Sequence, residues 1–550
     1  MDSLTVKRLL SNTAILPGVV TILCLAPFVG KAIHLDDPVF IWSAKQIQTS
    51  PFDFYGFEAN WYGTKMSMAK MHHNPPGVCY FIALAASLFG WSELALHTAL
   101  LLPALAVTLG TYYLARSFCA RPALAALAAA LTPVFLVSGT TVMADTTMLA
   151  FWVWAVALWV RGINANKSLH LFFAALLIAI CALTKYTGVA LLGLLFVYAM
   201  VQKRKLGTWA LFLLIPVAIL AGFEYATYAS YGTGLLSDAA NYAAKARSAR
   251  NADFFSNVLT GLSFTGGCIL TALLFSPLLW SRRLLIAGVV FTILLILGLG
   301  FVEKIAAFSI PKPAGAKWGF LVQLGLMTVA GLSILALAAA DFCKCRDAES
   351  SLLLLWVLGI FIFAAFLNWA VNARSILPMA PAVGILLMRR IDRRKDTTPQ
   401  ARLWPILLPL LPALLISMAV TWVDYKWAAM AREVAATVHQ RYRDWPGRVW
   451  FLGHWGFQYY MEANGYQIFD FKHSRAAPAD MIIIPSNNTG TKHFPRAWVY
   501  TKEAIHGTPC RWLALGSHEL GAGFYASGWG PLPFAAGPVA PEKYYVFIFK

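Results

Sequence analysis

The stretch His34-Leu-Asp-Asp-Pro-Val-Phe-Ile-Trp42 follows directly on the first long apolar segment of the chain. It places two adjacent carboxylates, Asp36 and Asp37, at the end of a hydrophobic helix. If that helix spans a membrane, the two acids lie at the boundary between lipid and water, where a carboxylate is costly and is a candidate functional group by default. The alternative is that they only mark the exit of the helix and face bulk water. The polar residues that gather at the same membrane face decide between the two interpretations.

The composition is typical of a membrane protein with many spans. Of the 550 residues 59% are hydrophobic and 13% are charged, and the mean hydropathy is +0.63, whereas a soluble domain has about 25% charged residues. The net charge of +19 comes from lysines and arginines in short loops, which is the pattern of cytoplasmic loops. We therefore expect a membrane-embedded chain with no nucleic-acid partner. The eight cysteines show no disulfide framework and no zinc-site spacing.

A spanning helix needs ~20 apolar residues, and this length predicts a first span at about Thr13–Ile33. A long outer loop, 34–93, follows. Its one apolar run, Gly77–Phe89, is too short to cross readily, and we expect it to lie in the membrane interface. The chain then has about thirteen spans. The later spans are expected at Ala95–Leu114, Ala123–Val137, Met148–Trp159, Leu169–Leu183, Gly188–Val201, Trp209–Ala226, Leu259–Leu279, Leu285–Phe301, Leu321–Ala340, Leu352–Phe366, Ser375–Leu387 and Pro405–Val423.

The basic loops support this count. If Gly77–Phe89 does not cross, every basic cluster lies on one side of the membrane; if it crosses, the later clusters face outward while those at the N-terminus stay inside. The positive-inside rule favours the first arrangement, and it predicts that the tail after Tyr425 is extracytoplasmic. The clusters are Lys7/Arg8, Arg116/Arg121, Arg161/Lys167, Lys203/Arg204/Lys205, Arg282/Arg283, Lys344/Arg346 and Arg389/Arg390/Arg393/Arg394/Lys395.

The C-terminal tail differs in composition from the rest of the chain. Hydrophobic runs shorten to strand length and turn residues become more frequent. We expect a membrane domain over 1–424 and an extracytoplasmic α/β domain over 425–550, of about 120 residues, with a partly parallel sheet because its strands are continuous apolar runs. Lone histidines in it, such as His454 and His473, are interpreted as structural. The predicted elements are a helix at Met430–Asp444 and strands at Arg448–Gly453, Tyr466–Phe471, Asp480–Pro485 and Tyr544–Phe549.

The predicted topology brings several unusual polar residues to the outer membrane face. Asp36 and Asp37 follow the first span, Asp145 begins another, Lys185 ends a third, and Arg374 opens a late span. Either outward cation alone is explained by snorkelling from a helix end. Together with the acids they predict a reaction site, because cations at a membrane surface bind lipid phosphates and a carboxylate beside them can act as a general base.

The first outer loop supplies further candidates. It is rich in aromatic residues, which either stack on sugar rings or lie in the membrane interface, and it contains His72-His73-Asn74-Pro75-Pro76, where the prolines fix the chain direction. The loop Tyr231–Asn257 carries Lys245, Arg247 and Arg250 and is interpreted as a cover over the site, the alternative being a solvated basic helix. The candidate substrate-loop residues are Tyr55, Trp61, Tyr62, His72, His73 and Asn74.

These motifs resemble the GT-C glycosyltransferases that use polyprenyl-phosphate sugars, in the group that contains protein O-mannosyltransferases and the lipid A aminoarabinose transferase. The resemblance covers roughly the first 390 residues. It rests on Asp36-Asp37 after the first helix, Asn74-Pro-Pro76 before an apolar run, Asp145 in Met143-Ala-Asp-Thr-Thr, Thr184-Lys185, and Arg374 in Arg-Ser-Ile-Leu-Pro-Met-Ala-Pro381. The tail resembles the extracytoplasmic domain of the aminoarabinose branch in position and size only.

The resemblance implies a GT-C fold of about thirteen spans, a first outer loop with amphipathic helices, and an enzyme of the bacterial inner membrane that is active at the extracytoplasmic face. It implies Asp36 as the general base, with Asp37 in place of the Glu of relatives and Asp145 as the second acid. The donor, for example an undecaprenyl-phosphate hexose or pentose, is expected to place its phosphate on Lys185 and Arg374.

Two departures from the family pattern affect the metal and the phosphate. A metal-contacting Glu of some relatives falls at His73 here, so a divalent metal such as zinc remains open although charge balance does not require one. An Arg of many relatives falls at His97, which is expected to bind phosphate only when protonated. We therefore expect Lys185 and Arg374 to provide more of the phosphate contact.

Other functions compete with this interpretation. A lipid or sugar transporter, or flippase, would need polar residues at mid-membrane and broken helices in paired halves. A sugar-binding sensor would act through the tail. An oligosaccharyltransferase would carry an Asp-x-Asp motif and a Trp-Trp-Asp signature, neither of which occurs where expected. The acceptor is open between lipid A or another glycolipid, a cell-envelope glycan and a protein hydroxyl.

Overall fold

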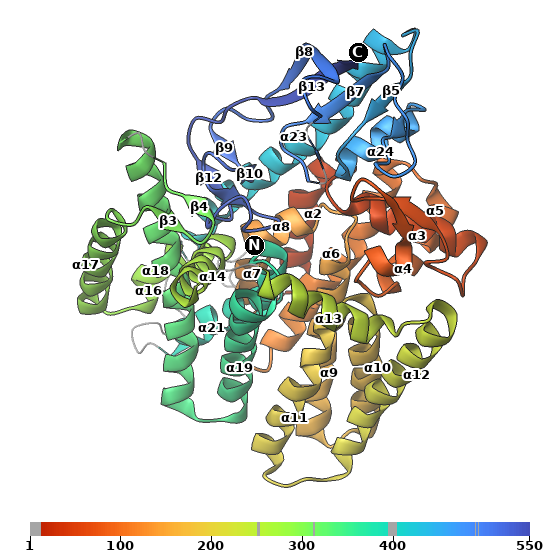
Figure 1. Ribbon diagram of the computed structural model, residues 1–550. Coiled ribbons are helices and arrows are strands. Elements are labelled where there is room, and N and C mark those ends of the chain that lie inside the picture. Colours follow the sequence, from red (N-terminus) through yellow and green to blue (C-terminus); the bar gives the residue numbers. More distant parts are fainter. Residues whose placement is uncertain (1–12, 250–252, 312–313, 394–403, 490, 493) are drawn as a thin grey trace.

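The computed structural model describes residues 13–249, 253–311, 314–393, 404–489, 491–492 and 494–550. A large helical region occupies most of the molecule, and a smaller region that contains a β-sheet lies at one end of it (Figure 1). The prediction of a polytopic helical protein with a C-terminal α/β domain is confirmed. Parts of the basic clusters, Lys7, Arg8, Arg250, Arg394 and Lys395, lie outside the described residues.

Eight helical segments in the described part of the chain are long and apolar enough to cross a membrane. Three shorter apolar helices accompany them, at Ile15–Phe28, Gly77–Phe89 and Ser168–Thr184. The expected number of thirteen spans is thus not confirmed. The eight segments are Glu93–Ala115, Ala144–Ala165, Tyr186–Lys203, Thr208–Tyr231, Arg282–Leu299, Gly315–Cys345, Ala348–Leu367 and Trp404–Tyr442.

Proline explains why some predicted spans are divided, because it removes a backbone donor and interrupts the helical ladder. The span predicted at Ala123–Val137 is broken before Pro133 into α7 and α8, and the Thr132 side chain caps the second piece by accepting from Phe135 N at 3.3 Å. The span predicted at 375–387 is divided in the same way beside Pro378, and Pro277 lies at the break between α15 and α16, whereas the break between α14 and α15 at Ile269-Leu270 has no proline. The pieces are α7 (Pro122–Ala130), α8 (Pro133–Ser138), α14 (Phe254–Cys268), α15 (Thr271–Leu274), α16 (Ser276–Leu279), α20 (Ala373–Ile376), η5 (Leu377–Met379) and α21 (Ala380–Asp392).

The helical region contains further helices besides these pieces. They are α2 (Ile15–Leu25), η1 (Ala26–Phe28), α6 (Glu93–Ala115), α9 (Ala144–Ala165), α10 (Ser168–Thr184), η2 (Tyr186–Val189), α11 (Ala190–Lys203), η3 (Thr208–Leu213), α12 (Leu214–Tyr231), α13 (Leu235–Ser248), α17 (Arg282–Leu299), α18 (Ala314–Cys345), α19 (Ala348–Ile362), η4 (Phe363–Leu367) and α22 (Trp404–Leu407). A short hairpin of β3 (Lys304–Ile305) and β4 (Phe308–Ser309) precedes α18.

The first outer loop folds into short helices beside a hairpin. Its elements are α3 (Asp37–Thr49), β1 (Glu58–Asn60), β2 (Lys65–Ser67), α4 (Met68–Met71) and α5 (Gly77–Phe89). Helix α5 has the bounds predicted from the sequence, and its 13 residues span roughly 20 Å, less than the ~30 Å of a bilayer core. It packs against α3 and α6. Its length is in keeping with the prediction that it does not cross.

The C-terminal region is built on one mixed sheet. Five strands lie in the order β6-β5-β7-β13-β8; β5 is parallel to β6 and β7, and β13 is antiparallel to β7 and β8. The partly parallel sheet is thus as expected. The helix α23 (Leu410–Tyr442) runs without a break through position 425, where the sequence predicted a domain boundary. The strands are β5 (Val449–Phe451), β6 (Gln467–Ile468), β7 (Met481–Pro485), β8 (Val499–Gly507), β9 (Leu513–Ala514), β10 (Gly516–Ser517), β11 (Ala522–Gly523), β12 (Ala535–Ala536) and β13 (Glu542–Phe549).

This region docks onto the first outer loop through helix α24 (Trp455–Ala463), beside α3 in Figure 1. The Tyr460 hydroxyl accepts from Ile33 N at 2.7 Å, and the Gln458 amide donates to the Asn60 carbonyl at 3.0 Å. Gly456 lies so close to the Ile33 carbonyl that an added Cβ would come within 2.1 Å of it. The C-terminal region therefore fixes the segment that leads into Asp36.

Candidate active site

Asp36 and Arg374 form one ion pair at the entrance to α3. Arg374 Nη2 donates to Asp36 Oδ2 at 3.1 Å, and the Asp36 side chain is 39% exposed, against 15% for Arg374. Leu35 has a φ of 43°, a left-handed conformation that is unusual for a residue other than glycine. This turn leads directly into α3, and it leaves Asp36 at the surface of the site with oxygen atoms open to a further partner.

Asp37 has a different environment from its neighbour. Its side chain is buried and accepts backbone N–H groups from His34 at 2.9 Å and Val142 at 2.9 Å. Burial raises the pKa of Asp37 to about 7, against the lowering effects of Lys31 and the two backbone bonds. Asp37 thus ties the first loop to the segment before α9, and it is far less accessible than Asp36.

The second ion pair joins α9 to the end of α10. Lys185 Nζ donates to Asp145 Oδ1 at 2.5 Å; Asp145 is 3% exposed and Lys185 is 20% exposed. The carboxylates of Asp145 and Asp36 both act electrostatically on the Arg374 guanidinium. The two pairs are therefore parts of one charged group, in which two acids alternate with two cations.

The Asn74-Pro75-Pro76-Gly77 segment is packed against the Lys185 turn. A Cβ added to Gly77 would lie 2.5 Å from the Leu183 carbonyl, so only glycine permits this approach. The carbonyl of Asn74 accepts from the Tyr55 hydroxyl at 2.7 Å, and Tyr55 is fully buried. The structure thus brings these two predicted substrate-loop residues to the neighbourhood of Lys185, where they act through the backbone and through packing.

The two histidines of the loop have separate contacts. His72 is buried between Phe40 and Tyr55, with ring centroids at 4.8 and 5.2 Å, and burial lowers its pKa to about 3. His73 stacks on Tyr242 of α13 at 3.9 Å, and its Nδ1 lies 3.4 Å from Asp238 Oδ2. Helix α13 thus contacts His73, whereas the interpretation of this loop as a cover over the lipid site stays a prediction.

No group of three or more His, Cys, Asp or Glu residues in the described part of the chain is arranged to hold a metal ion. His73 has one carboxylate neighbour, Asp238. Since a protein zinc site takes three or four such ligands, the described residues around His73 do not fit a resident zinc. The metal at His73 remains an untested prediction.

Aromatic residues of the first loop meet the C-terminal region beside Asp36. Trp61 is buried and stacks on His454 with ring centroids at 4.4 Å, whereas Tyr62 is 49% exposed and lies with its ring edge-on to His454 at 6.1 Å. Burial lowers the pKa of His454 to about 4, although Asp36 raises it. His454 was interpreted as structural; its only sequence signal is its place directly after a predicted strand, and that does not reveal its contact with the loop.

His97 does not join the charged group. It is buried on α6, and its Nδ1 is 2.8 Å from the carbonyl of Glu93. The structure gives it no hydrogen bond or ion pair with Lys185 or Arg374 among the described contacts. Its predicted role in phosphate binding therefore has no geometric support here.

A buried network that the sequence did not predict lies behind Arg374. The Arg374 guanidinium carbon is 5.7 Å from the centre of the Tyr525 ring, and the Tyr525 hydroxyl donates to Asp424 at 2.9 Å. Asp424 also forms an ion pair with Lys31, and both side chains are fully buried. His34 lies beside this pair, with Nε2 3.7 Å from Asp424 Oδ1 and without a hydrogen-bond partner among the described residues. The segment around Tyr525 also bonds to the backbone next to Arg374, where Ala373 N donates to the Phe524 carbonyl at 2.8 Å.

Several polar groups around the two pairs have unused hydrogen-bonding capacity. Buried polar atoms normally find partners, yet Nε of Arg374 and four hydroxyl groups are buried without one among the described residues. These hydroxyls belong to the residues that directly follow Asp145 and Lys185, namely Thr146, Thr147, Tyr186 and Thr187. Arg374 Nε thus has no acceptor among the described residues, and the accessible carboxylate of Asp36 can take up a proton.

Residues 73–224 match the family model described as dolichyl-phosphate-mannose-protein mannosyltransferase. The matched segment contains His73, Asn74, Asp145 and Lys185, and it ends before Arg374. No curated protein matches the chain by sequence.

Two solved structures of ArnT from Cupriavidus metallidurans, one bound to undecaprenyl phosphate and one in the apo state, are similar to this chain at 16% identity. The TM-scores are 0.43 and 0.44, and each match covers 86% of this chain and 92% of the other. These values are too low to transfer the role of any residue. The family match over residues 73–224 confirms the resemblance to the GT-C glycosyltransferases that the sequence motifs indicated.

Proposed function

We propose that this protein is a membrane glycosyltransferase that moves a sugar from a polyprenyl-phosphate donor to an acceptor hydroxyl. The observation that carries the proposal is the pairing of two cations with two acids, Arg374 with Asp36 and Lys185 with Asp145, in one group. The family match supports a glycosyltransferase. The donor, the acceptor and the individual roles below are our inference from the charges and accessibilities.

The donor phosphate is assigned to Lys185 and Arg374. A guanidinium and an ammonium are the side chains that bind phosphate most strongly. Lys185 is 20% exposed, and the Nε of Arg374 still lacks an acceptor among the described residues. Since the Arg374 side chain is 15% exposed as a whole, both cations are within reach of a phosphate oxygen at the surface of the site.

Asp36 is assigned as the general base. The oxygen of the acceptor hydroxyl attacks the anomeric carbon, the bond between that carbon and the phosphate oxygen breaks, and the hydroxyl proton passes to the Asp36 carboxylate. The polyprenyl phosphate leaves as a monoester and stays on its cations. One displacement inverts the configuration at the anomeric carbon. The exposure of Asp36 makes it a better candidate than the buried Asp37.

The replacement Asp36→Asn tests the proposal. We expect transfer from a polyprenyl-phosphate sugar to fall by about 10²–10⁴-fold while the protein stays folded, because the amide keeps a hydrogen bond to Arg374 but cannot take a proton. Asp53→Asn, on the same loop and outside the charged group, is the matched control. Turnover near that of the wild type would contradict the role of Asp36, and movement of the lipid between leaflets without product would identify a transporter instead.

We further propose that the reaction needs no metal, because the two cations already meet the charge of the leaving phosphate. Dialysis against EDTA is then expected to leave transfer unchanged. A loss of activity that zinc restores would contradict this proposal and would direct attention to His73.

The site and the C-terminal region are proposed to face the extracytoplasmic side of a bacterial plasma membrane. The distribution of basic loops supports this orientation. A cysteine introduced at the exposed Lys502 of β8 is expected to react with a membrane-impermeant thiol reagent in intact cells. Mass spectrometry of lipid-linked sugars and envelope glycans, with and without the protein, would name the donor sugar and the acceptor among lipid A, another glycan and protein.

A further inference from the structure

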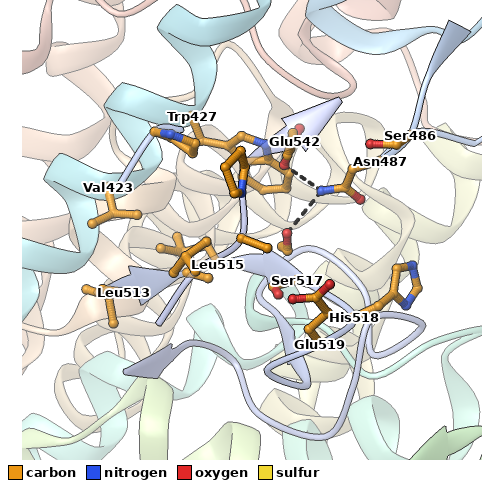
Figure 2. Close-up of a pocket in the computed structure, with 16 residues that line it drawn as sticks. Val423, Trp427, Ser486, Asn487, Leu513, Leu515, Ser517, His518, Glu519 and Glu542 are labelled. Carbon is orange, nitrogen blue, oxygen red and sulfur yellow. Dashed lines mark hydrogen bonds between the residues drawn. The ribbon is translucent and has the colours of Figure 1, made fainter. Parts of the chain in front are cut away.

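A cavity lies in the C-terminal region, and none of the four residues of the charged group lines it. Its volume is about 150 Å³, and a cavity of that size admits one six-membered ring. Figure 2 shows its walls: Trp427 of α23 and Glu542 at the start of β13 on one side, and the loop with Ser517, His518 and Glu519 on the other. We call this cavity the Glu542 pocket.

The lining of the Glu542 pocket excludes an anionic ligand. It contains two carboxylates, from Glu542 and Glu519, and none of its 16 lining residues is lysine or arginine. This is notable in a chain with 44 lysines and arginines and only 25 acids. A phosphate or carboxylate group would meet repulsion here, so the pocket takes a different ligand from the site at Lys185.

Glu542 is held in position by an oriented amide. Asn487 Nδ2 donates to Glu542 Oε1 at 2.6 Å and to the Gly516 carbonyl at 3.0 Å (Figure 2), and Trp529 Nε1 donates to Asn487 Oδ1 at 2.7 Å. Burial raises the pKa of Glu542 to about 7. These contacts use only part of the four acceptor positions of a carboxylate, so Glu542 can accept from a ligand.

Two serines supply donors to complement the carboxylates. Ser486 Oγ accepts from Lys543 N at 3.0 Å, and Ser517 Oγ accepts from Leu520 N at 3.3 Å. Each serine can therefore donate its own hydroxyl proton. Donors and acceptors thus line a cavity of one-ring size whose remaining walls, including Leu515 and Val539, are apolar. A ring that carries several hydroxyl groups matches this mixture, whereas an organic cation would leave the serine donors without acceptors.

We propose that the Glu542 pocket binds one neutral sugar unit of the acceptor. That the sugar belongs to the acceptor rests on the proposed transferase function; that a sugar binds rests on the pocket alone. The position of the pocket fits a sugar of the acceptor, because Trp427 forms one wall and also lies beside two rings near Arg374. The centre of the Trp427 ring is 4.8 Å from that of His34 and 6.3 Å from that of Tyr525. Those two residues belong to the network behind Arg374, so a sugar in the pocket lies one aromatic ring away from it.

Saturation-transfer NMR on the full-length protein in detergent tests the pocket. The probes are the methyl α-glycosides of glucose, mannose and galactose, with tetramethylammonium as the cationic probe. At pH 8.5, above the pKa of Glu542, we expect at least one glycoside to bind the wild type and to bind Glu542→Gln about tenfold more weakly, because a charged acceptor is lost. Glu433→Gln, which changes an exposed glutamate of α23, is the matched control and should bind as the wild type does.

Ser517→Ala keeps the inference testable if Glu542→Gln does not fold. It leaves Glu542 and Asn487 in place, and we expect it to weaken glycoside binding about threefold. The proposal is overturned if none of the glycosides binds, if both variants bind as well as the wild type, or if tetramethylammonium binds in place of a sugar. Glycoside binding by a protein without transfer activity would instead contradict the proposed function and leave the pocket assignment standing.

Discussion

Two lysine–aspartate pairs show how burial separates a structural charge from a reactive one. In the pair Lys31–Asp424 both side chains are fully buried, Lys31 also donates to Thr140, and Asp424 also accepts from the Tyr525 hydroxyl. In the pair Lys185–Asp145 the lysine is 20% exposed, and the hydroxyl groups that follow each residue in the chain are without partners. The residue types are the same, but the first pair is saturated and the second is open.

The difference indicates what each pair does. A saturated buried pair has no capacity for a ligand; its removal affects folding, because the remaining charge would be left uncompensated. An open pair can exchange part of its bonding for a phosphate. Lys31–Asp424 holds Tyr525 beneath Arg374, so it supports the site from behind, while Lys185–Asp145 forms part of the site itself.

Breaking the buried pair is expected to have the largest effect. Lys31→Met leaves Asp424 buried and unpaired, and we expect the free energy of unfolding to fall by about 3–5 kcal/mol. The double variant Lys31→Met/Asp424→Leu removes both charges and should recover much of this loss. Denaturant titration of the purified protein measures both. A single variant as stable as the wild type would show that the pair is not structural.

A change to the open pair, Lys185–Asp145, is expected to lower the activity of the protein more than its stability. Lys185→Ala removes a phosphate contact, and we expect the apparent KM for the lipid donor to rise by about tenfold or more, the effect of losing one charged hydrogen bond. The loss of unfolding free energy should be clearly smaller than for Lys31→Met, because Arg374 still acts on Asp145. Donor titrations on both variants give the comparison. An unchanged KM would remove Lys185 from the phosphate site.

Removal of the Tyr525 hydroxyl, which links the buried pair Lys31–Asp424 to the ring beneath Arg374, should have the smallest effect. Tyr525→Phe keeps the ring under Arg374 and removes only the bond to Asp424, so we expect about 1 kcal/mol of stability to be lost and a change of a few-fold in kcat, with KM for the donor unaffected. Steady-state kinetics separate the two parameters. If KM rose as strongly as in Lys185→Ala, the network would be part of the phosphate site itself.

The sequence predicted the open parts of the site better than the buried ones. Asp36, Asp145, Lys185 and Arg374 are rare charges at the ends of apolar runs, and counting basic loops placed them on one side. The structure brings them together. Helix α5 and strand β7 can also be predicted from the sequence, because each is one uninterrupted apolar run.

The features that sequence reasoning missed depend on distant contacts. Lys31 lies within an apolar run and pairs with a residue 393 positions away, and nothing local to either residue reveals that partner. Tyr525 and His454 reach the site from loops of the C-terminal region. The strand β8 has mostly exposed and half-buried residues, so it lacks the apolar run that identified β7. The expected number of thirteen spans is not confirmed, because several predicted spans are divided into helices too short to cross a membrane singly.

The most direct test of the account is the affinity for undecaprenyl phosphate, measured by a lipid-binding assay on the wild type, Lys185→Ala and Lys45→Ala. Lys45 is an exposed lysine on α3 that lies over the Trp91 ring, so it is a matched cation outside the charged group. We predict that Kd rises about tenfold for Lys185→Ala and stays unchanged for Lys45→Ala. Equal affinities for all three proteins would contradict the assignment of the open pair to the donor phosphate.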